Sequence, residues 1–325
     1  MKHRGARAAQ RKPRRGLTAF GAIVAVAAIA AGVVLYNRSA DPTAALPVNL
    51  PSTPQSYLGI YTDQFPSSYA PLTAFGRQTG TKPDVAMYYS GWYVPFPTGF
   101  ADLAANSGVV PLVQMDPQNI SLARIAAGRY DSYLSLYAET VKAYRHPVII
   151  SFGHEMNGGW YSWGYGHTTP AVFVNAWRHI VRLFRALGAT NVTWMWTVNV
   201  INDTQRGMIP RPTAWWPGSS YVNWVGIDGY YLKPSWQFAP LFGPTIGVVR
   251  ELTGAPILIA ETGAVPAADQ PAKIADLFAG IRNYGLLGFV WFDATNSIGQ
   301  QFGLDGSAAT AAFRRGAATW KRPGS

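Results

Sequence analysis

Two glutamates are the first candidates for chemistry in this sequence. The chain contains only four glutamates, and Glu155 and Glu261 each come just after an apolar run. Glu139 and Glu251 lie instead in segments with a helical pattern, where a solvated surface role is typical. A carboxylate beside a buried strand loses solvation, which costs free energy, so its presence there indicates a specific role. Two such carboxylates in one cleft suit glycoside hydrolysis, in which one protonates the leaving oxygen and the other attacks the anomeric carbon.

Other catalytic patterns are missing from the sequence. The run from His154 places Gly158 where a zinc protease motif needs its second histidine. The chain has no G-x-S-x-G nucleophile elbow, no phosphate-binding loop of the G-x-x-x-x-G-K-[ST] type and no cysteine. With five histidines and no ligand cluster among them, we expect no metal ion and no cofactor.

The elements that must position the glutamates are short apolar runs separated by stretches with helical patterns. Eight runs predict strands, at residues 57–61, 84–89, 109–115, 148–152, 192–198, 224–230, 257–260 and 287–292. The clearest helices are predicted at residues 130–144, 171–187, 245–252 and 271–284. Eight strands alternating with helices over this length predict an α/β fold of the (β/α)8 TIM-barrel type. A doubly wound sheet is the alternative.

Polar residues follow the predicted strands, at the end where TIM barrels carry their active sites. They are Asp63, Ser90, Asp116, His154 with Glu155, Asn199, Asp228 with Tyr230, Glu261, and Trp291 with Asp293. Asp63, Asp116 and Asp293 receive no specific role, because each could bind a sugar hydroxyl or cap a turn. The sequence therefore brings Glu155 and Glu261 to one barrel mouth.

Charge and aromatic content point to a carbohydrate ligand. The net charge is +11, but seven lysines and arginines lie in the first sixteen residues, so the remainder is only mildly basic. That distribution argues against nucleic-acid binding by the folded part. The 12 tryptophans and 17 tyrosines favour stacking on flat ligands such as sugars.

The N-terminal region predicts that the folded part of the chain is localised outside the cytoplasm. Residues 1–16 form a basic cytoplasmic tail, and residues 17–36 are an uncharged apolar run that serves as a membrane anchor or a signal sequence. Twenty helical residues span about 30 Å, the thickness of a bilayer core, which favours an uncleaved anchor. Residues 37–56 are proline-rich and predict a linker, and residues 57–325 predict the catalytic barrel. We expect an anchored or secreted monomer.

Four segments of the chain resemble glycoside hydrolase family 26. The first and most specific is SFGHEMNGGWYSWG at 151–164, which resembles the acid/base segment of the family. ILIAETG at 257–263 resembles its nucleophile segment, GIDGY at 226–230 its strand-six motif, and GFVWFD at 288–293 its strand-eight motif. The resemblance implies a barrel of the clan with the acid/base after strand four and the nucleophile after strand seven.

The resemblance also implies a role for each matching residue. Glu155 resembles the acid/base and Glu261 the nucleophile, with Tyr230 donating a hydrogen bond to the nucleophile. His154, Trp160, Trp163, Asp228, Tyr230 and Trp291 resemble the substrate-binding set, in which Asp228 supports the nucleophile network and Trp291 is the platform under the sugar at the cleavage site.

The implied function is that of an exported, retaining endo-β-glycosidase acting on β-1,4-mannan-type polysaccharide. A mixed-linkage β-glucanase or a β-1,3-xylanase of the same family is the alternative among enzymes. A non-catalytic cell-surface sugar-binding protein is the alternative from another class, although such a protein has no need of both glutamates.

Overall fold

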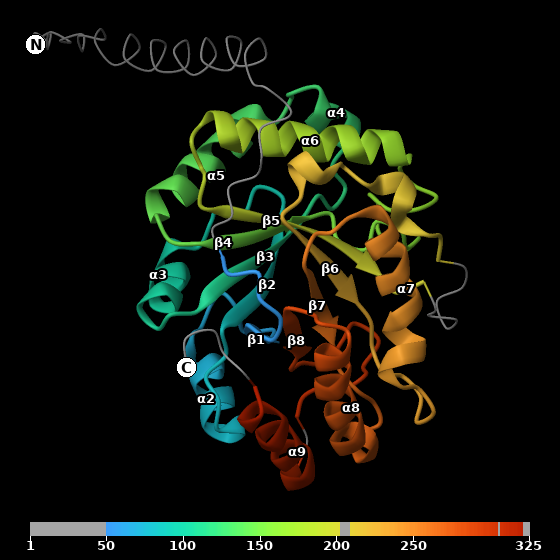
Figure 1. The fold of residues 1–325 in the computed structure, drawn as a ribbon. Helices are drawn as coiled ribbons and strands as arrows, with labels where there is room; N and C mark the ends of the chain where they lie inside the picture. The colour runs from blue at the N-terminus through green and yellow to red at the C-terminus, as the bar shows by residue number, and fades with distance from the viewer. Residues whose placement is uncertain (1–49, 202–208, 305, 321–325) are drawn as a thin grey trace, which may run out of the picture. The chain divides into compact units, whose positions relative to one another are not determined.

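The predicted strands form one closed parallel barrel in the computed structural model, which describes residues 50–201, 209–304 and 306–320. Each strand pairs with the next, and β8 pairs with β1, so the sheet has no free edge (Figure 1). The strands are β1 Tyr57–Tyr61, β2 Val85–Gly91, β3 Val110–Asp116, β4 Val148–Phe152, β5 Val192–Asn199, β6 Trp224–Asp228, β7 Ile257–Thr262 and β8 Gly288–Phe292. The predicted TIM barrel is therefore confirmed.

Alternate residues along the strands fill the barrel interior. Side chains in a strand point to opposite faces in turn, so every second residue faces inward. The inward set includes Val85 and Met87 of β2, Leu258 of β7 and Val290 of β8, all fully buried. The outward residues are also buried, because helices cover the sheet, and this explains why the strands read as continuous apolar runs.

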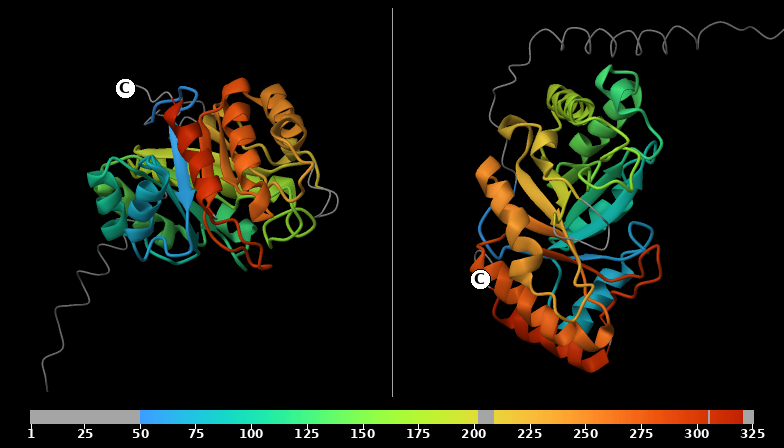
Figure 2. Two further views of the ribbon diagram at one scale, coloured as in Figure 1. Left: turned by 90° about the horizontal axis from the view of Figure 1, so that it is seen from below. Right: turned by 90° about the vertical axis from the view of Figure 1, so that its right-hand side faces the viewer.

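Helices surround the strands in the views of Figures 1 and 2. They are α2 Ala70–Thr79, α3 Thr98–Asn106, α4 Leu122–Ala126, α5 Asp131–Tyr144, α6 Pro170–Ala186, α7 Phe238–Leu252, α8 Gln270–Asn283 and α9 Gly306–Ala318. The helix α9 packs against both α8 and α2, which closes the ring of helices (Figure 1). The four helices predicted from sequence correspond to α5, α6, α7 and α8. The helix α7 begins earlier than predicted, because Pro240 and Pro244 conceal its helical pattern in the sequence.

The segment before β1 packs against the base of the barrel. Leu50 is buried in the same cluster as Tyr57 and Trp224, and the Tyr57 hydroxyl donates to the carbonyl of Pro51 over 2.8 Å. The backbone N–H of Gln55 donates to the carbonyl of Leu286 over 2.9 Å. Residues 50–56, which the sequence assigns to the linker, therefore belong to the folded unit.

The predicted tail at 1–16 and the apolar run at 17–36 lie outside the described residues, as does the linker up to residue 49. Within the ranges that the structure describes, none of the helices combines the length and the apolar character that crossing a bilayer requires.

Removal of the N-terminal region tests this boundary. A protein of residues 41–325 should keep the melting temperature of the barrel, since it retains Leu50 and its contacts. A protein of residues 57–325 should melt at least about 4 °C lower, because burial of one leucine side chain contributes about 2 kcal/mol. Calorimetry of the two proteins measures the difference. Equal melting temperatures would contradict the assignment of residues 50–56 to the folded unit.

Candidate active site

A cavity of about 580 Å³ opens at the carboxyl ends of the strands and contains both candidate glutamates. Its volume is in the range of pockets that enclose a ligand larger than one sugar ring. The described residues that line it are Tyr61, Tyr89, Glu155, Trp160, Tyr161, Tyr230, Glu261, Phe292, Thr295, Asn296, Ser297 and Ile298. They come from β1, β2, β7 and β8 and from the loops after β4, β6 and β8, so the closed barrel is what brings them together.

Glu261, near the end of β7, is held by two tyrosine hydroxyls. Tyr89 donates to Oε1 over 2.5 Å and Tyr230 donates to Oε2 over 2.7 Å. Burial raises the pKa of both tyrosines well above 10, so both remain protonated donors. Burial also raises the pKa of the Glu261 carboxyl, and the charge of Glu155 adds to this, although the charge of His154 and both tyrosines act in the opposite direction.

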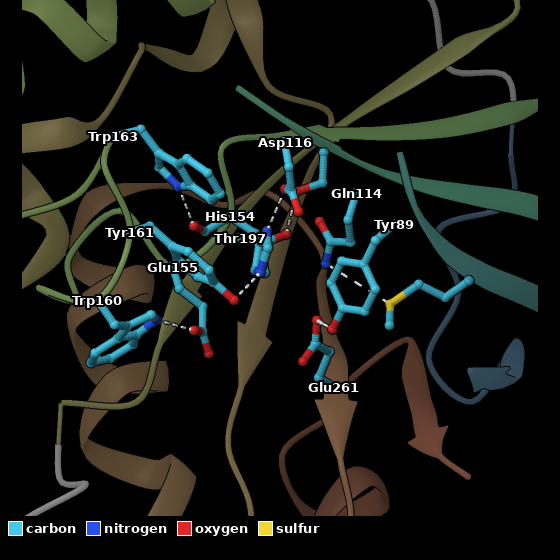
Figure 3. A network of polar contacts seen from close by, with 12 residues as sticks. Tyr89, Gln114, Asp116, His154, Glu155, Trp160, Tyr161, Trp163, Thr197 and Glu261 are labelled. Carbon is cyan, nitrogen blue, oxygen red and sulfur yellow. Dashed lines mark hydrogen bonds and ion pairs between the residues drawn. The ribbon is translucent and has the colours of Figure 1, made fainter. Parts of the chain in front are cut away.

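Glu155 stands three residues beyond β4 with a left-handed backbone, at φ 52°. This region is costly for a residue with a side chain, and such strain is typical of functional sites. The indole N–H of Trp160 donates to Oε2 over 2.6 Å, and the side-chain amide of Asn199 donates to Oε1. Both carboxylate oxygens are thus engaged, and the side chain is aimed into the cavity (Figure 3).

The loop after β4 depends on two glycines for its close packing. A Cβ on Gly158 would lie 2.2 Å from a ring carbon of Trp160, and would push the indole away from Glu155. A Cβ on Gly164 would lie 2.2 Å from the Gly158 carbonyl oxygen. The loop is tied by the N–H of Tyr165, which donates to the carbonyls of Met156 and Gly158. A side chain at Gly158 or Gly164 would therefore disturb the packing of this loop.

His154 supplies a positive charge between the acidic groups. Its Nδ1 lies 2.9 Å from Oδ1 of Asp116, and its Nε2 lies 3.1 Å from the Tyr161 hydroxyl (Figure 3). Burial alone would lower the pKa of this imidazole. The negative charges of Asp116 and of the two glutamates outweigh burial and raise the pKa from 6.5 to about 9. At neutral pH both ring nitrogens therefore carry protons.

Four predicted site residues meet in the cavity as expected, and a fifth adjoins it. Glu155, Glu261, Trp160 and Tyr230 line the cavity, and the predicted hydrogen bond from Tyr230 to Glu261 is present. Trp160 is half-buried and uses its indole N–H on Glu155. His154 is buried next to the cavity, where its ring contacts Tyr161.

Two predicted tryptophans do not reach the cavity. Trp291 is 0% exposed and faces outward, where its indole N–H donates to the carbonyl of Phe302 and its ring meets Phe313 of α9. Because Val290 faces inward, the alternation of the strand turns Phe292 to the cavity instead. Trp163 is 1% exposed and stacks behind the cavity-lining Tyr161, with ring centroids 4.3 Å apart. Neither Trp291 nor Trp163 can present a ring face to a sugar.

Asp228 is also too deep for a direct contact with substrate, because its side chain is fully buried at the end of β6. Its strand places it beside Glu261 of β7 and Asn199 of β5. The charge of Asp228 contributes to the raised pKa of Tyr230. Asp228 therefore belongs to the support beneath the cavity, as the sequence expects for the nucleophile network, and not to its lining.

Three residues that contact the candidate glutamates or His154 received no role from the sequence. Tyr89 continues the inward series of Val85 and Met87 along β2, and this alternation is a signal that could have identified it. Asn199 and Asp116 stand at strand ends and bind Glu155 and His154 respectively. Of the other unassigned aspartates, Asp293 accepts a hydrogen bond from the backbone N–H of Leu304 over 2.9 Å. This hydrogen bond gives Asp293 a part in the turn after β8, and burial raises the pKa of its carboxyl.

Comparisons with known proteins point to one family of glycoside hydrolases. The family model described as glycosyl hydrolase family 26 matches residues 124–270. Endoglucanase H of Acetivibrio thermocellus is 30% identical over 254 residues, which are 72% of this chain and 27% of that protein. The mannan endo-1,4-beta-mannosidase of Bacillus subtilis is 25% identical over 167 residues, 48% of this chain and 42% of that protein. The chain thus spans less than half the length of either relative.

A solved structure shares the fold. The structure titled Cellulomonas fimi endo-beta-1,4-mannanase double mutant superposes with a TM-score of 0.64 and 18% sequence identity, covering 81% of this chain and 70% of that one. At this identity the likeness concerns the barrel alone.

The charge state of His154 gives a prediction for stability. The pKa of His154 is raised from 6.5 to about 9 in the folded protein, so protonation of this residue stabilises the fold. That contribution to the free energy of unfolding is complete below pH 6.5 and is lost as the pH rises through about 9. The melting temperature should therefore fall between pH 7 and pH 10. Asp116→Asn removes the largest of the charges that raise this pKa, so the variant should be less stable at pH 7 and should show less of this fall. Calorimetry across this range measures both effects. Parallel curves for the two proteins would contradict a charged His154.

Proposed function

The chain belongs to glycosyl hydrolase family 26, and on that premise we propose that it hydrolyses β-1,4-mannan-type polysaccharide with retention of configuration. The observation that carries the proposal is a single cavity lined by Glu155 and Glu261, each held by fixed hydrogen-bond donors. The mannosidase relative from Bacillus subtilis favours mannan as the substrate. Family members act on β-linked polysaccharides.

In the first step Glu261 is the nucleophile and Glu155 the acid. A Glu261 oxygen attacks the anomeric carbon while protonated Glu155 gives its proton to the glycosidic oxygen, and the leaving chain departs with that proton. The two tyrosines on Glu261 keep its oxygens aimed, and the imidazolium of His154 favours its ionised form. The product of this step is a covalent glycosyl–Glu261 ester.

In the second step a water molecule replaces the leaving chain. Glu155, now ionised, takes a proton from the water as its oxygen attacks the anomeric carbon, and the bond to Glu261 breaks. Both glutamates return to their starting states. The hydrogen bonds from Trp160 and Asn199 hold Glu155 in position for the proton transfers of both steps.

A mixed-linkage β-glucan is the second candidate substrate. Endoglucanase H is the relative that matches the larger part of this chain, and its name describes action on glucan. Glucose and mannose differ at one hydroxyl, so the same pair of carboxylates serves either sugar.

We also propose that the enzyme acts outside the cytoplasm. The basic residues 1–16 and the apolar residues 17–36 support this proposal, as does a polymeric substrate that cannot cross a membrane.

A panel of polysaccharides tests substrate and location together. Cells that express the full chain are given mannan, lichenan or β-1,3-xylan, and released reducing ends are measured for intact and for lysed cells. We expect the highest rate on mannan, with intact and lysed cells equal, and no product from Glu261→Ala. A preference for lichenan would select the glucanase. Product only after lysis would refute export, and no product from any polysaccharide would favour a sugar-binding protein.

The roles of the glutamates are separated by substitution at Glu155. Glu155→Ala should lose about 10²–10⁴-fold of the rate on polysaccharide, because general acid help is lost. It should still release the phenolate of an activated aryl glycoside, which leaves without a proton. Added azide needs no base, so it should restore turnover and give a glycosyl azide of retained configuration, measurable by NMR. The same assay on Glu261→Ala is the control, and there azide should give no retained product. If azide did not restore turnover of Glu155→Ala, the acid/base role of Glu155 would be contradicted and a structural role would be favoured.

A further inference from the structure

The end of strand β5 extends past its neighbour β4 at the barrel mouth. The pairing of the two strands ends at Trp194 of β5, whereas β5 itself continues to Asn199. In a parallel sheet both backbone groups of a residue point to the same neighbouring strand, and this direction alternates along the chain. The carbonyl of Thr197 points to the β4 side, where it accepts from the N–H of Glu155 over 3.0 Å. The backbone groups of Asn199 therefore point to that side as well, where β4 has already ended.

The side chain of Asn157 supplies the partner that β4 does not. Its Oδ1 accepts from the backbone N–H of Asn199 over 2.9 Å, and its Nδ2 donates to the backbone carbonyl of the same residue over 2.9 Å. Its Nδ2 also donates to the carbonyl of Pro210 over 3.4 Å. Asn157 is 0% exposed and Asn199 1%, so water cannot replace these bonds without opening the loop. One buried amide thus fixes both backbone groups of Asn199.

Asn199 in turn binds the glutamate that we propose as the acid. Its side-chain amide donates to Oε1 of Glu155. Trp160, the donor to Oε2, lies on the same loop as Glu155, so the two residues can shift together. Asn199 is the donor that belongs to a strand of the barrel. Its bond therefore ties the carboxyl group to the rigid part of the fold, where a strained residue at φ 52° needs support.

We propose that Asn157 is a positioning residue for the acid, because it fixes the backbone of Asn199 and thereby the amide that holds Glu155. This proposal rests on the proposed function, which makes Glu155 the acid. Asn157 is not among the described residues that line the cavity, and it takes no part in the proton transfers. Its contribution is specific to steps that need an accurately placed carboxyl group.

Two aryl β-glycosides of one disaccharide test the proposal, in the sugar series that the polysaccharide panel selects. A dinitrophenolate leaves without a proton, whereas a phenolate needs one from the acid. Asn157→Ala should lower kcat/KM on the phenyl glycoside by about 10²-fold, the size of effect that a small misplacement of a catalytic group produces. It should leave kcat/KM on the dinitrophenyl glycoside nearly unchanged. Asn157→Ser, which keeps a smaller polar group, should show the same selectivity and serves if Asn157→Ala does not fold.

A second variant shows whether Asn157 acts through Asn199. Asn199→Ala removes the amide itself, so it should cause the same selective loss as Asn157→Ala. In the double variant the substitution at Asn157 should add no further loss on the phenyl glycoside, because the group that it positions is already gone. Losses that multiply in the double variant would contradict this route.

Asn191→Ala is the matched control, since Asn191 lies at the opposite end of β5 and makes the same kind of bonds. Its Nδ2 donates to the carbonyls of Val141 and His146, each over 2.8 Å. Asn191→Ala and Asn157→Ala should both lower the melting temperature measured by calorimetry. The ratio of the two kcat/KM values should change for Asn157→Ala and stay at the wild-type value for Asn191→Ala.

Equal losses on the two aryl substrates would overturn the positioning role and make Asn157 a residue of the fold alone. A wild-type enzyme that cleaves neither aryl substrate nor any polysaccharide would instead refute the proposed function, so the two failures are distinguishable.

Discussion

Burial of two carboxyl groups in one cavity is the constraint on which the rest of this structure depends. A buried carboxylate loses its hydration, and a second one nearby adds repulsion. Glu261 shows both effects, because burial first and the charge of Glu155 next raise its pKa. Fixed hydrogen-bond donors compensate for these costs: two tyrosine hydroxyls bind Glu261, and an indole and an amide bind Glu155. One imidazolium, that of His154, adds a positive charge. Each donor comes from a different strand or loop, so a closed barrel is required to assemble them.

His154 links the electrostatics of the site to its packing. Its charge lowers the pKa of Glu261, and Asp116 sustains that charge. The indole N–H of Trp163 donates to the backbone carbonyl of His154 over 2.8 Å, and the Trp163 ring supports Tyr161, which contacts the imidazole. A residue with no access to substrate thus holds the charge in place. Asp228 is likewise buried beneath the cavity and does not line it, and its charge helps to raise the pKa of Tyr230.

The strands, the barrel and the position of the two glutamates in one cavity could be predicted from sequence, because apolar runs and polar strand ends are local signals. The side to which a residue points was harder to predict. Trp291 and Phe292 are adjacent aromatic residues on β8, and only the position of Val290 in the barrel interior decides which of them faces the cavity. Tyr89 lies 172 positions from Glu261 in the chain, so their hydrogen bond has no local signature. The helices α3 and α9 were missed because small residues dominate them and give a weak apolar pattern.

The left-handed backbone at Glu155 has a consequence for how this fold changes over evolutionary time. Glycine and asparagine adopt that conformation more readily than glutamate, so either replacement would relax the backbone while removing the carboxyl group that we propose as the acid. Such a replacement would relieve backbone strain, but it would also remove the acceptor of the Trp160 indole and of the Asn199 amide, which destabilises the loop. The strained backbone and the two hydrogen bonds of Glu155 therefore stand or fall together, and the proposed role as acid gives a reason for a glutamate to be kept at this position.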